Sequence, residues 1–162
     1  MSFNLSSFLN KAKQTLQSVG SSIQENIEVY APEKWSPEKQ YINAIVASMA
    51  LMVYADKKVE NEEVELVINT INTSEIFKKH DMVGEGLELY STHIEKLTTS
   101  LEKSQVEYTL TVAKIMNDIS RVKKDEWKNQ IVDLALNISA SDGDIAEEEM
   151  TMLNKIKASL GV

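Results

Sequence analysis

Apolar residues recur at every third or fourth position along most of the chain, which is the period of an α-helix. Their positions predict helical segments within residues 5–23, 36–53, 64–71, 83–101, 104–119, 127–138 and 150–160, with a short segment before His80. No alternating run of β-branched residues, as a strand would show, competes with these stripes. We therefore predict an all-α fold, a single compact helical domain of about seven or eight helices.

Single residues mark where some of these helices begin and which face they bury. Ser36, Pro37 and Glu38 follow the order of a capping serine, a first-turn proline and a first-turn acid. Ser104 opens a later helix, whose periodicity predicts an inward face formed by Val106, Leu110, Ala113 and Met116. The methionines fall on apolar faces and are interpreted as core residues, among them Met49, Met52, Met150 and Met152.

The N-terminal segment predicts an amphipathic helix that is separate from the other predicted helices. Its apolar positions, from Leu5 to Ile23, share one helical face, while Lys11 and Lys13 lie on the polar side. Docking on the domain is the commoner fate of such a helix, and peripheral membrane contact through residues 3–19 is the alternative. Because the helical signal weakens toward Pro32, we predict an N-terminal helix and linker over residues 1–30 and an all-helical domain over residues 31–162.

Composition then restricts the chemistry open to the protein and the compartment in which we expect it. The 162 residues contain no cysteine, which excludes disulfides, thiol catalysis and cysteine–metal sites. The net charge of −8 and a single arginine, Arg121, make nucleic acid an unexpected partner. The longest nearly apolar stretch, residues 44–55, predicts a buried core helix because a membrane span needs roughly 20 such residues. Since the N-terminus lacks a signal-peptide pattern, we expect a cytoplasmic protein.

Recognisable catalytic patterns are missing from the sequence. The two histidines, His80 and His93, lack metal-ligand spacing and are interpreted as surface or packing residues. No nucleophile elbow, phosphate-binding loop, dinucleotide-binding glycine pattern or zinc-protease motif occurs. We therefore expect that the protein is not an enzyme.

An internal repeat carries the most informative residues. A shift of 86 positions superposes Tyr41 on Trp127 and Asp56 on Asp142. It also superposes Glu62-Glu63 on Glu148-Glu149, and apolar residues around them in one copy fall on apolar residues in the other. In each copy an aspartate follows an apolar helix, and a glutamate seven residues later opens the next helix. The sequence thus predicts two quasi-equivalent helix–turn–helix halves.

The two turns of the repeat offer carboxylates that can point toward a common spot. In the second turn these are Asp142, Asp144 and Glu149, and Gly143 can adopt the left-handed conformation that ends a helix. In the first turn they are Asp56 and Glu63, but Lys57 and Lys58 replace the glycine and the second aspartate. An all-oxygen donor set favours Ca²⁺ or Mg²⁺ over zinc or copper.

Neither turn is a complete EF-hand loop. Counting back from Glu149 as the twelfth position places Ile138 and Ala140 where oxygen ligands are required. Acids in a first helical turn also stabilise the helix dipole, by roughly 0.3–1 kcal/mol each, and a glutamate at the third position can cap the helix. A divalent-cation site and a pair of helix caps are therefore both open at this point.

The paired motifs resemble those of the TerB family of tellurite-resistance proteins. The resemblance rests on the run from Ala47 to Asp56 with Glu62-Glu63, and on its partner from Ile138 to Ile145 with Glu148-Glu149. The order along the chain is also similar, with a Thr-Ser-Glu turn at residues 73–75 between the motifs. The resemblance implies an acidic metal-binding surface formed by Asp56, Glu63, Asp142 and Glu149. Lys57, where the family has glycine, is the departure; its side chain disfavours the left-handed turn and its charge competes with a cation.

The same resemblance implies a role and partners. It implies resistance to tellurite and related stress, together with a membrane protein of the TerC type and with TerD-type proteins, at the inner face of the membrane. Our leading hypothesis is a non-enzymatic, divalent-metal-binding scaffold that docks to such partners. The alternative hypothesis is a purely structural helical interaction module with no metal site.

Overall fold

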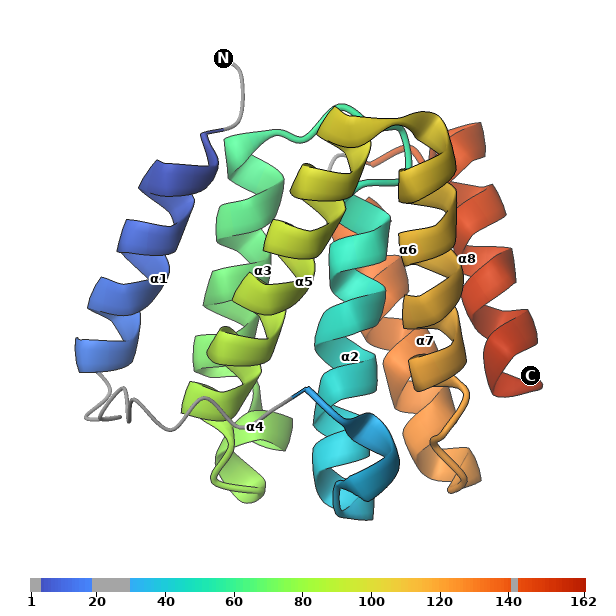
Figure 1. Ribbon diagram of the computed structural model, residues 1–162. Helices are drawn as coiled ribbons and strands as arrows, with labels where there is room; N and C mark the ends of the chain where they lie inside the picture. The colour runs from blue at the N-terminus through green and yellow to red at the C-terminus, as the bar shows by residue number, and fades with distance from the viewer. Residues whose placement is uncertain (1–3, 19–29, 141–142) are drawn as a thin grey trace.

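The computed structural model describes residues 4–18, 30–140 and 143–162, and all regular structure in them is helical (Figure 1). The elements are α1 (Leu5–Ser18), a 3₁₀ turn η1 (Pro32–Lys34), α2 (Pro37–Val53), α3 (Asn61–Thr73), α4 (Glu75–Lys79), α5 (Val83–Lys103), α6 (Gln105–Ile119), α7 (Asp125–Ser139) and α8 (Glu147–Leu160). The predicted all-α fold is therefore confirmed.

Helix α2 forms the centre of the molecule. It begins as predicted, with the Ser36 hydroxyl accepting a hydrogen bond from the Lys39 amide at 3.2 Å and Pro37 in the first turn. Every residue from Tyr41 to Tyr54 is buried. Because α2 is apolar on all sides, other helices must surround it, and it contacts α3, α5, α6, α7 and α8.

Helices α2 and α7 lie side by side and run in the same direction (Figure 1). At their N-terminal ends the rings of Tyr41 and Trp127 stack with centroids 4.4 Å apart and planes 6° apart. These are equivalent positions of the sequence repeat. The turns that follow α2 and α7 consequently leave the bundle at one end, and α3 and α8 return from it. The predicted quasi-equivalence of two halves stays a prediction that this arrangement favours.

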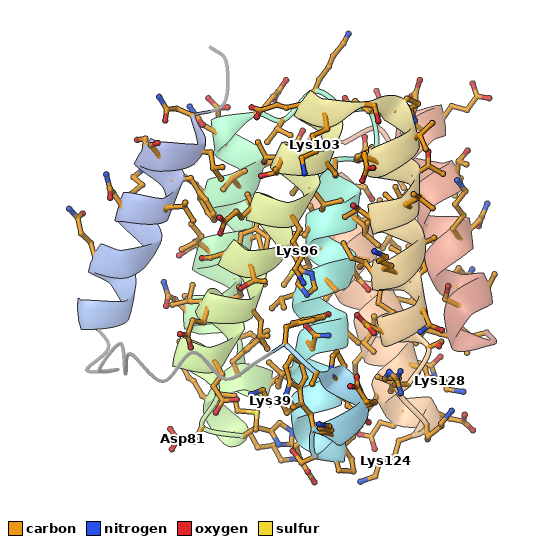
Figure 2. All side chains as sticks on the ribbon, viewed as in Figure 1. Lys39, Asp81, Lys96, Lys103, Lys124 and Lys128 are labelled. Atoms are coloured by element: carbon orange, nitrogen blue, oxygen red, sulfur yellow. The ribbon has the colours of Figure 1, made fainter. Side chains whose placement is uncertain are left out.

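The opposite end of the bundle, where α2 and α7 begin, is rich in aromatic and basic side chains. Lys39 lies over the ring of Trp35 at 4.4 Å and Lys124 over that of Trp127 at 4.3 Å (Figure 2). A cation over an aromatic face is attracted by the ring quadrupole. The two ends of the bundle therefore differ in chemistry.

The N-terminal helix docks on the bundle. Phe8 is buried and meets Tyr90 of α5 edge to face with ring centroids 5.8 Å apart, and Lys11 pairs with Glu65 of α3. The predicted docking is thus observed for α1, whereas residue 3 and much of the predicted linker lie outside the described residues. No helix in the described ranges is both long and apolar enough to cross a membrane.

The inward face predicted for α6 is wrong. Val106 and Leu110 are 68% and 51% exposed, Ala113 is also exposed, and Met116 is half-buried. The buried face consists instead of Tyr108, Ile115 and Ile119. The sequence carries both stripes, and the second one wins because it buries a tyrosine whose hydroxyl donates to the Tyr54 carbonyl at 3.0 Å. Met150 is likewise exposed rather than core, unlike Met49, Met52 and Met152.

Gly86 sets the approach of α4 to α5. A β-carbon at this position would lie 2.7 Å from a ring carbon of Phe77, which is fully buried. We predict that Gly86→Ala lowers the free energy of unfolding by about 1–3 kcal/mol, because overpacking outweighs the gain in helix propensity. Urea unfolding measures the change. In the background of Phe77→Leu the loss should shrink, and strictly additive losses would contradict the predicted clash.

Candidate functional site

The first acidic turn follows the central helix. Asp56 is exposed, and its Oδ1 accepts a hydrogen bond from the Lys58 amide at 2.9 Å, closing an Asx turn. Glu63 lies in the first turn of α3 and is half-buried. Asp56 is therefore held by its own turn, and Glu63 by the helix that the turn leads into.

Lys57 adopts the conformation expected of a glycine. Its φ of 61° is left-handed, so the chain adopts this turn although a side chain disfavours it. The ammonium group donates to Gln105 Oε1 at 2.6 Å and lies 5.7 Å from the centre of the Tyr108 ring. The lysine charge is thus directed toward α6.

The second acidic turn has the same backbone feature at the equivalent position. Gly143 has a φ of 92°, and its amide donates to the Ala140 carbonyl at 3.1 Å. Asp144 is exposed. Glu149 lies in the first turn of α8 and accepts from the Ala146 amide at 3.4 Å, which is one half of a capping box. Asp142 lies outside the described residues.

Four of the five candidate ligands can thus be placed, in two turns at one end of the bundle. Within residues 4–18, 30–140 and 143–162, no three acidic or histidine side chains gather closely enough to hold a metal ion. The predicted cation site, which also includes Asp142, stays a prediction.

A buried chain of polar side chains was not predicted from the sequence. In this polar chain, His93 Nε2 lies 2.8 Å from Asn43 Oδ1, and the Asn43 amide donates to the Tyr30 hydroxyl at 3.3 Å. The Tyr30 hydroxyl donates to Asp118 Oδ2 at 2.8 Å. Asn43 and His93 are fully buried. The signal available in the sequence was Asn43, a polar residue on the otherwise apolar central helix.

The hydrogen bonds of the polar chain define the state of His93. The Asn43 amide nitrogen donates to Tyr30, so the Asn43 amide oxygen is the atom that faces His93. Because this oxygen can only accept, His93 Nε2 must carry the proton. Burial, with a smaller contribution from the Lys96 charge, lowers the pKa of His93 from 6.5 to about 3. Burial also raises the pKa of Tyr30. Both rings are therefore neutral near pH 7, as a low-dielectric core requires.

The sequence profile described as tellurite resistance protein TerB matches residues 42–162. The chain belongs to the TerB family. The match includes both acidic turns and leaves out α1 and the start of α2. No curated protein and no solved structure gives a match.

Membership of the TerB family indicates a tellurite-resistance-associated domain. TerB is not a known enzyme family. In this TerB-family chain, the chemistry to be explained is that of the two turns and of the surfaces that the helices present.

The two turns of the TerB domain should respond in opposite ways to substitution. At φ 92° an L-residue is strained, so Gly143→Ala should lower the free energy of unfolding by about 1 kcal/mol. Lys57→Gly removes left-handed strain but loses an exposed hydrogen bond and the contact with the Tyr108 ring, so the free energy of unfolding should stay the same or rise by up to about 1 kcal/mol. Chemical denaturation compares the two variants, and a clear loss in Lys57→Gly would refute the strain argument.

Because His93 is neutral in the folded protein, the free energy of unfolding should decrease as the pH is lowered. Below pH 6.5 the unfolded chain binds a proton that the folded protein does not accept until about pH 3, so stability decreases as pH falls through this window. The slope contributed by one histidine approaches about 1.4 kcal/mol per pH unit. We predict that His93→Gln, which keeps a donor for Asn43, flattens the dependence between pH 7 and 5. His80→Gln is the control, and equal slopes in wild type and His93→Gln would contradict the assignment.

Proposed function

We propose that this TerB-family protein is a non-enzymatic scaffold in the response to tellurite and related stress, and that a divalent cation bound at the second acidic turn stabilises it. The cation links the end of α7 to the start of α8. Fixing that helix pair presents a defined surface to partner proteins.

One observation supports this proposal: the two turns of the repeat lie at the same end of the bundle, and each has a residue with left-handed backbone at the equivalent position. Lys57 at φ 61° and Gly143 at φ 92° occupy matching positions, and Glu63 and Glu149 each lie in the first turn of the next helix. Lys57 keeps the left-handed backbone although this conformation is strained for a lysine. The strain indicates that the geometry of the turn itself is needed.

The second turn is the principal site on charge grounds. It offers the carboxylates of Asp142, Asp144 and Glu149, whereas the first turn adds Lys57 and Lys58 to Asp56 and Glu63. Carboxylate oxygens suit hard cations, so the ligand is Ca²⁺ or Mg²⁺. Coordination by Asp142 would supply the third ligand that the described residues lack.

The partners follow from family resemblance. A membrane protein of the TerC type and TerD-type proteins are the proposed partners, which would recruit this cytoplasmic protein to the inner face of the membrane. A scaffold rather than an enzyme is supported by the sequence, since reduction or methylation of tellurite calls for thiols, a redox cofactor or a methyl donor site, and the chain has no cysteine.

A second candidate function is a purely structural interaction module. The specific observation in its favour is the bond from the Ala146 amide to Glu149, because a carboxylate used as a helix cap needs no metal. The two functions differ in whether Glu149 acts through its charge or through its hydrogen bond.

The test separates these two roles of Glu149. Calorimetric titration of the apo protein with CaCl₂ and MgCl₂, with thermal unfolding in parallel, should show saturable binding that stabilises the fold by about 2.7 kcal/mol at a hundred times the dissociation constant. Asp142→Ala should abolish binding. Glu149→Gln keeps a capping oxygen but loses the charge, so it should lower apo stability by no more than about 1 kcal/mol and weaken binding at least tenfold.

Glu147→Gln is the matched control, because Glu147 is exposed in the same helical turn and is not a proposed ligand. It should bind cation within about twofold of wild type. If no variant differs from wild type, or if millimolar cation does not bind, the carboxylates are helix caps and the structural module stands.

A further inference from the structure

Helix α6 carries apolar side chains on an exposed face. Val106 and Leu110 follow one another at helical spacing on this face, and both are exposed. Ala113 and Asn117 continue the face toward the C-terminal end of the helix and are exposed as well. Apolar side chains in register on one helix face gain free energy when a partner covers them. The face therefore has the character of an interaction surface.

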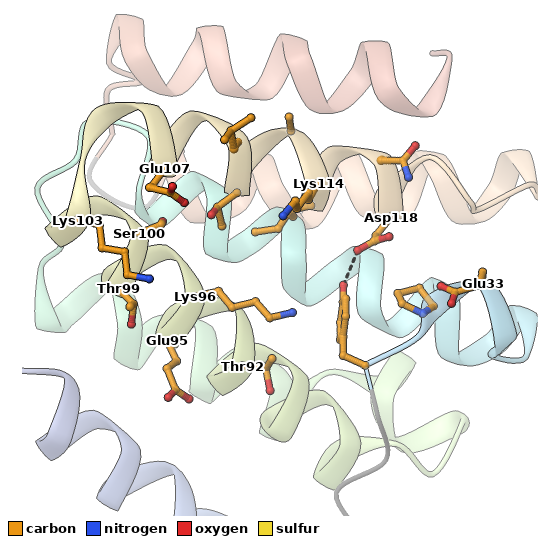
Figure 3. Close-up of a pocket in the computed structure, with 17 residues that line it drawn as sticks. Glu33, Thr92, Glu95, Lys96, Thr99, Ser100, Lys103, Glu107, Lys114 and Asp118 are labelled. Atoms are coloured by element: carbon orange, nitrogen blue, oxygen red, sulfur yellow. Dashed lines mark hydrogen bonds between the residues drawn. The ribbon is translucent and has the colours of Figure 1, made fainter.

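Charged side chains of both signs border this face. Figure 3 shows Glu107 and Lys114 on α6, where both line a groove of about 1010 Å³ between α5 and α6. The two side chains therefore lie on the same flank of α6, the flank beside α5. The whole lining of the groove carries four carboxylates and three lysines, so it is close to neutral. A partner that itself offers both signs of charge suits it better than a strongly acidic or strongly basic one.

Glu107 and Lys114 have no charged partner within the described part of the chain, since neither forms an ion pair there. Lys114 also acts on Lys96 of α5. Partial burial lowers the pKa of Lys96, Asp118 raises it, and the charge of Lys114 lowers it further. A carboxylate brought beside Lys114 from outside therefore gains an ion pair and reduces a repulsion within the chain.

The spacing of Glu107 and Lys114 matches a second copy of the same helix. The two residues lie two turns apart, about 10 Å at 1.5 Å per residue, and equally far from a point between Leu110 and Thr111. When two copies of α6 pack antiparallel about a two-fold axis through that point, Glu107 of each copy faces Lys114 of the other. Because both residues lie on the flank beside α5, the two ion pairs form on the same side of the contact.

The same axis also matches the uncharged side chains of the face. Leu110 lies next to the axis, so it meets Leu110 of the second copy. Val106 comes opposite a position between Ala113 and Asn117 of the second copy, where the small alanine leaves room for the valine. Apolar contacts and ion pairs thus select one and the same register, which is the property of a self-complementary surface.

We propose that the protein forms a reversible two-fold symmetric dimer, in which the exposed face of α6 packs antiparallel against α6 of a second copy. Helix α6 has 15 residues and is about 22 Å long. A contact between two such faces is smaller than a standard interface, which buries about 1,600 Å², so the dimer is weak and concentration-dependent. This inference goes beyond the proposed function and does not depend on it.

Sedimentation equilibrium of the full-length protein, from about 10 µM to 1 mM and in EDTA, tests the dimer. We expect a monomer–dimer equilibrium for wild type. Glu107→Lys and Lys114→Glu each place like charges opposite one another, so each variant alone should dimerise at least tenfold more weakly. An equimolar mixture of these two variants restores both ion pairs in a mixed dimer and should associate within about threefold of wild type. Leu110→Gln should weaken dimerisation about tenfold.

Glu88→Lys and Lys78→Glu are the matched controls, since both residues are exposed, lie outside α6 and the groove, and give the same changes in net charge. Each control variant should dimerise within about twofold of wild type. Thermal unfolding establishes that every variant is folded before its association is measured.

Three results would overturn the proposal: wild type that stays monomeric at 1 mM, α6 charge variants that dimerise as wild type does, or a mixture of them that stays monomeric. Because the measurement is made in EDTA, loss of the dimer leaves the proposed cation site untouched. A failed cation titration likewise leaves the dimer untouched.

Discussion

The burial of α2 on every side is the constraint on which the rest of the structure depends. A helix with no polar face has no stable position at a surface, so α3, α5, α6, α7 and α8 must pack around it. With α7 lying parallel to α2, the turns that follow both helices emerge together. The placement of both acidic turns at one end of the bundle is therefore a consequence of core packing and needs no attraction between them.

The polar chain connects this core to the surface. Asn43 and His93 are hydrogen-bonded to each other inside the bundle, and Tyr30 continues the hydrogen bonds outward to Asp118 on α6. The same tyrosine ring lies beneath the ammonium group of Lys96 of α5. Sliding of α5 along α2 would break the Asn43–His93 hydrogen bond in the core, so the network favours one position of α5 on α2.

Helical periodicity was sufficient to predict every long helix, and the order Ser36-Pro37-Glu38 predicted the capped start of α2. It failed on α6 because Val106 and Leu110 form a stripe as regular as that of Tyr108 and Ile115, and only the tertiary contacts decide between the two faces. The repeat predicted both acidic turns. The backbone at Lys57 was not predictable, because intrinsic preference opposes it. The polar chain joins residues 30, 43, 93 and 118, and its long-range pairs leave no local pattern.

The positions of Trp35 and Trp127 decide what optical methods can report. Trp35 immediately precedes the cap of α2, and Trp127 stacks on Tyr41 near the start of α7. Twelve residues of helix, about 18 Å, separate Trp127 from the end of α7. Intrinsic fluorescence therefore registers loss of the fold but is nearly blind to a local event at the acidic turns. A reporter for that end of the molecule has to be introduced, and a chain without cysteine accepts a single labelled thiol there without ambiguity.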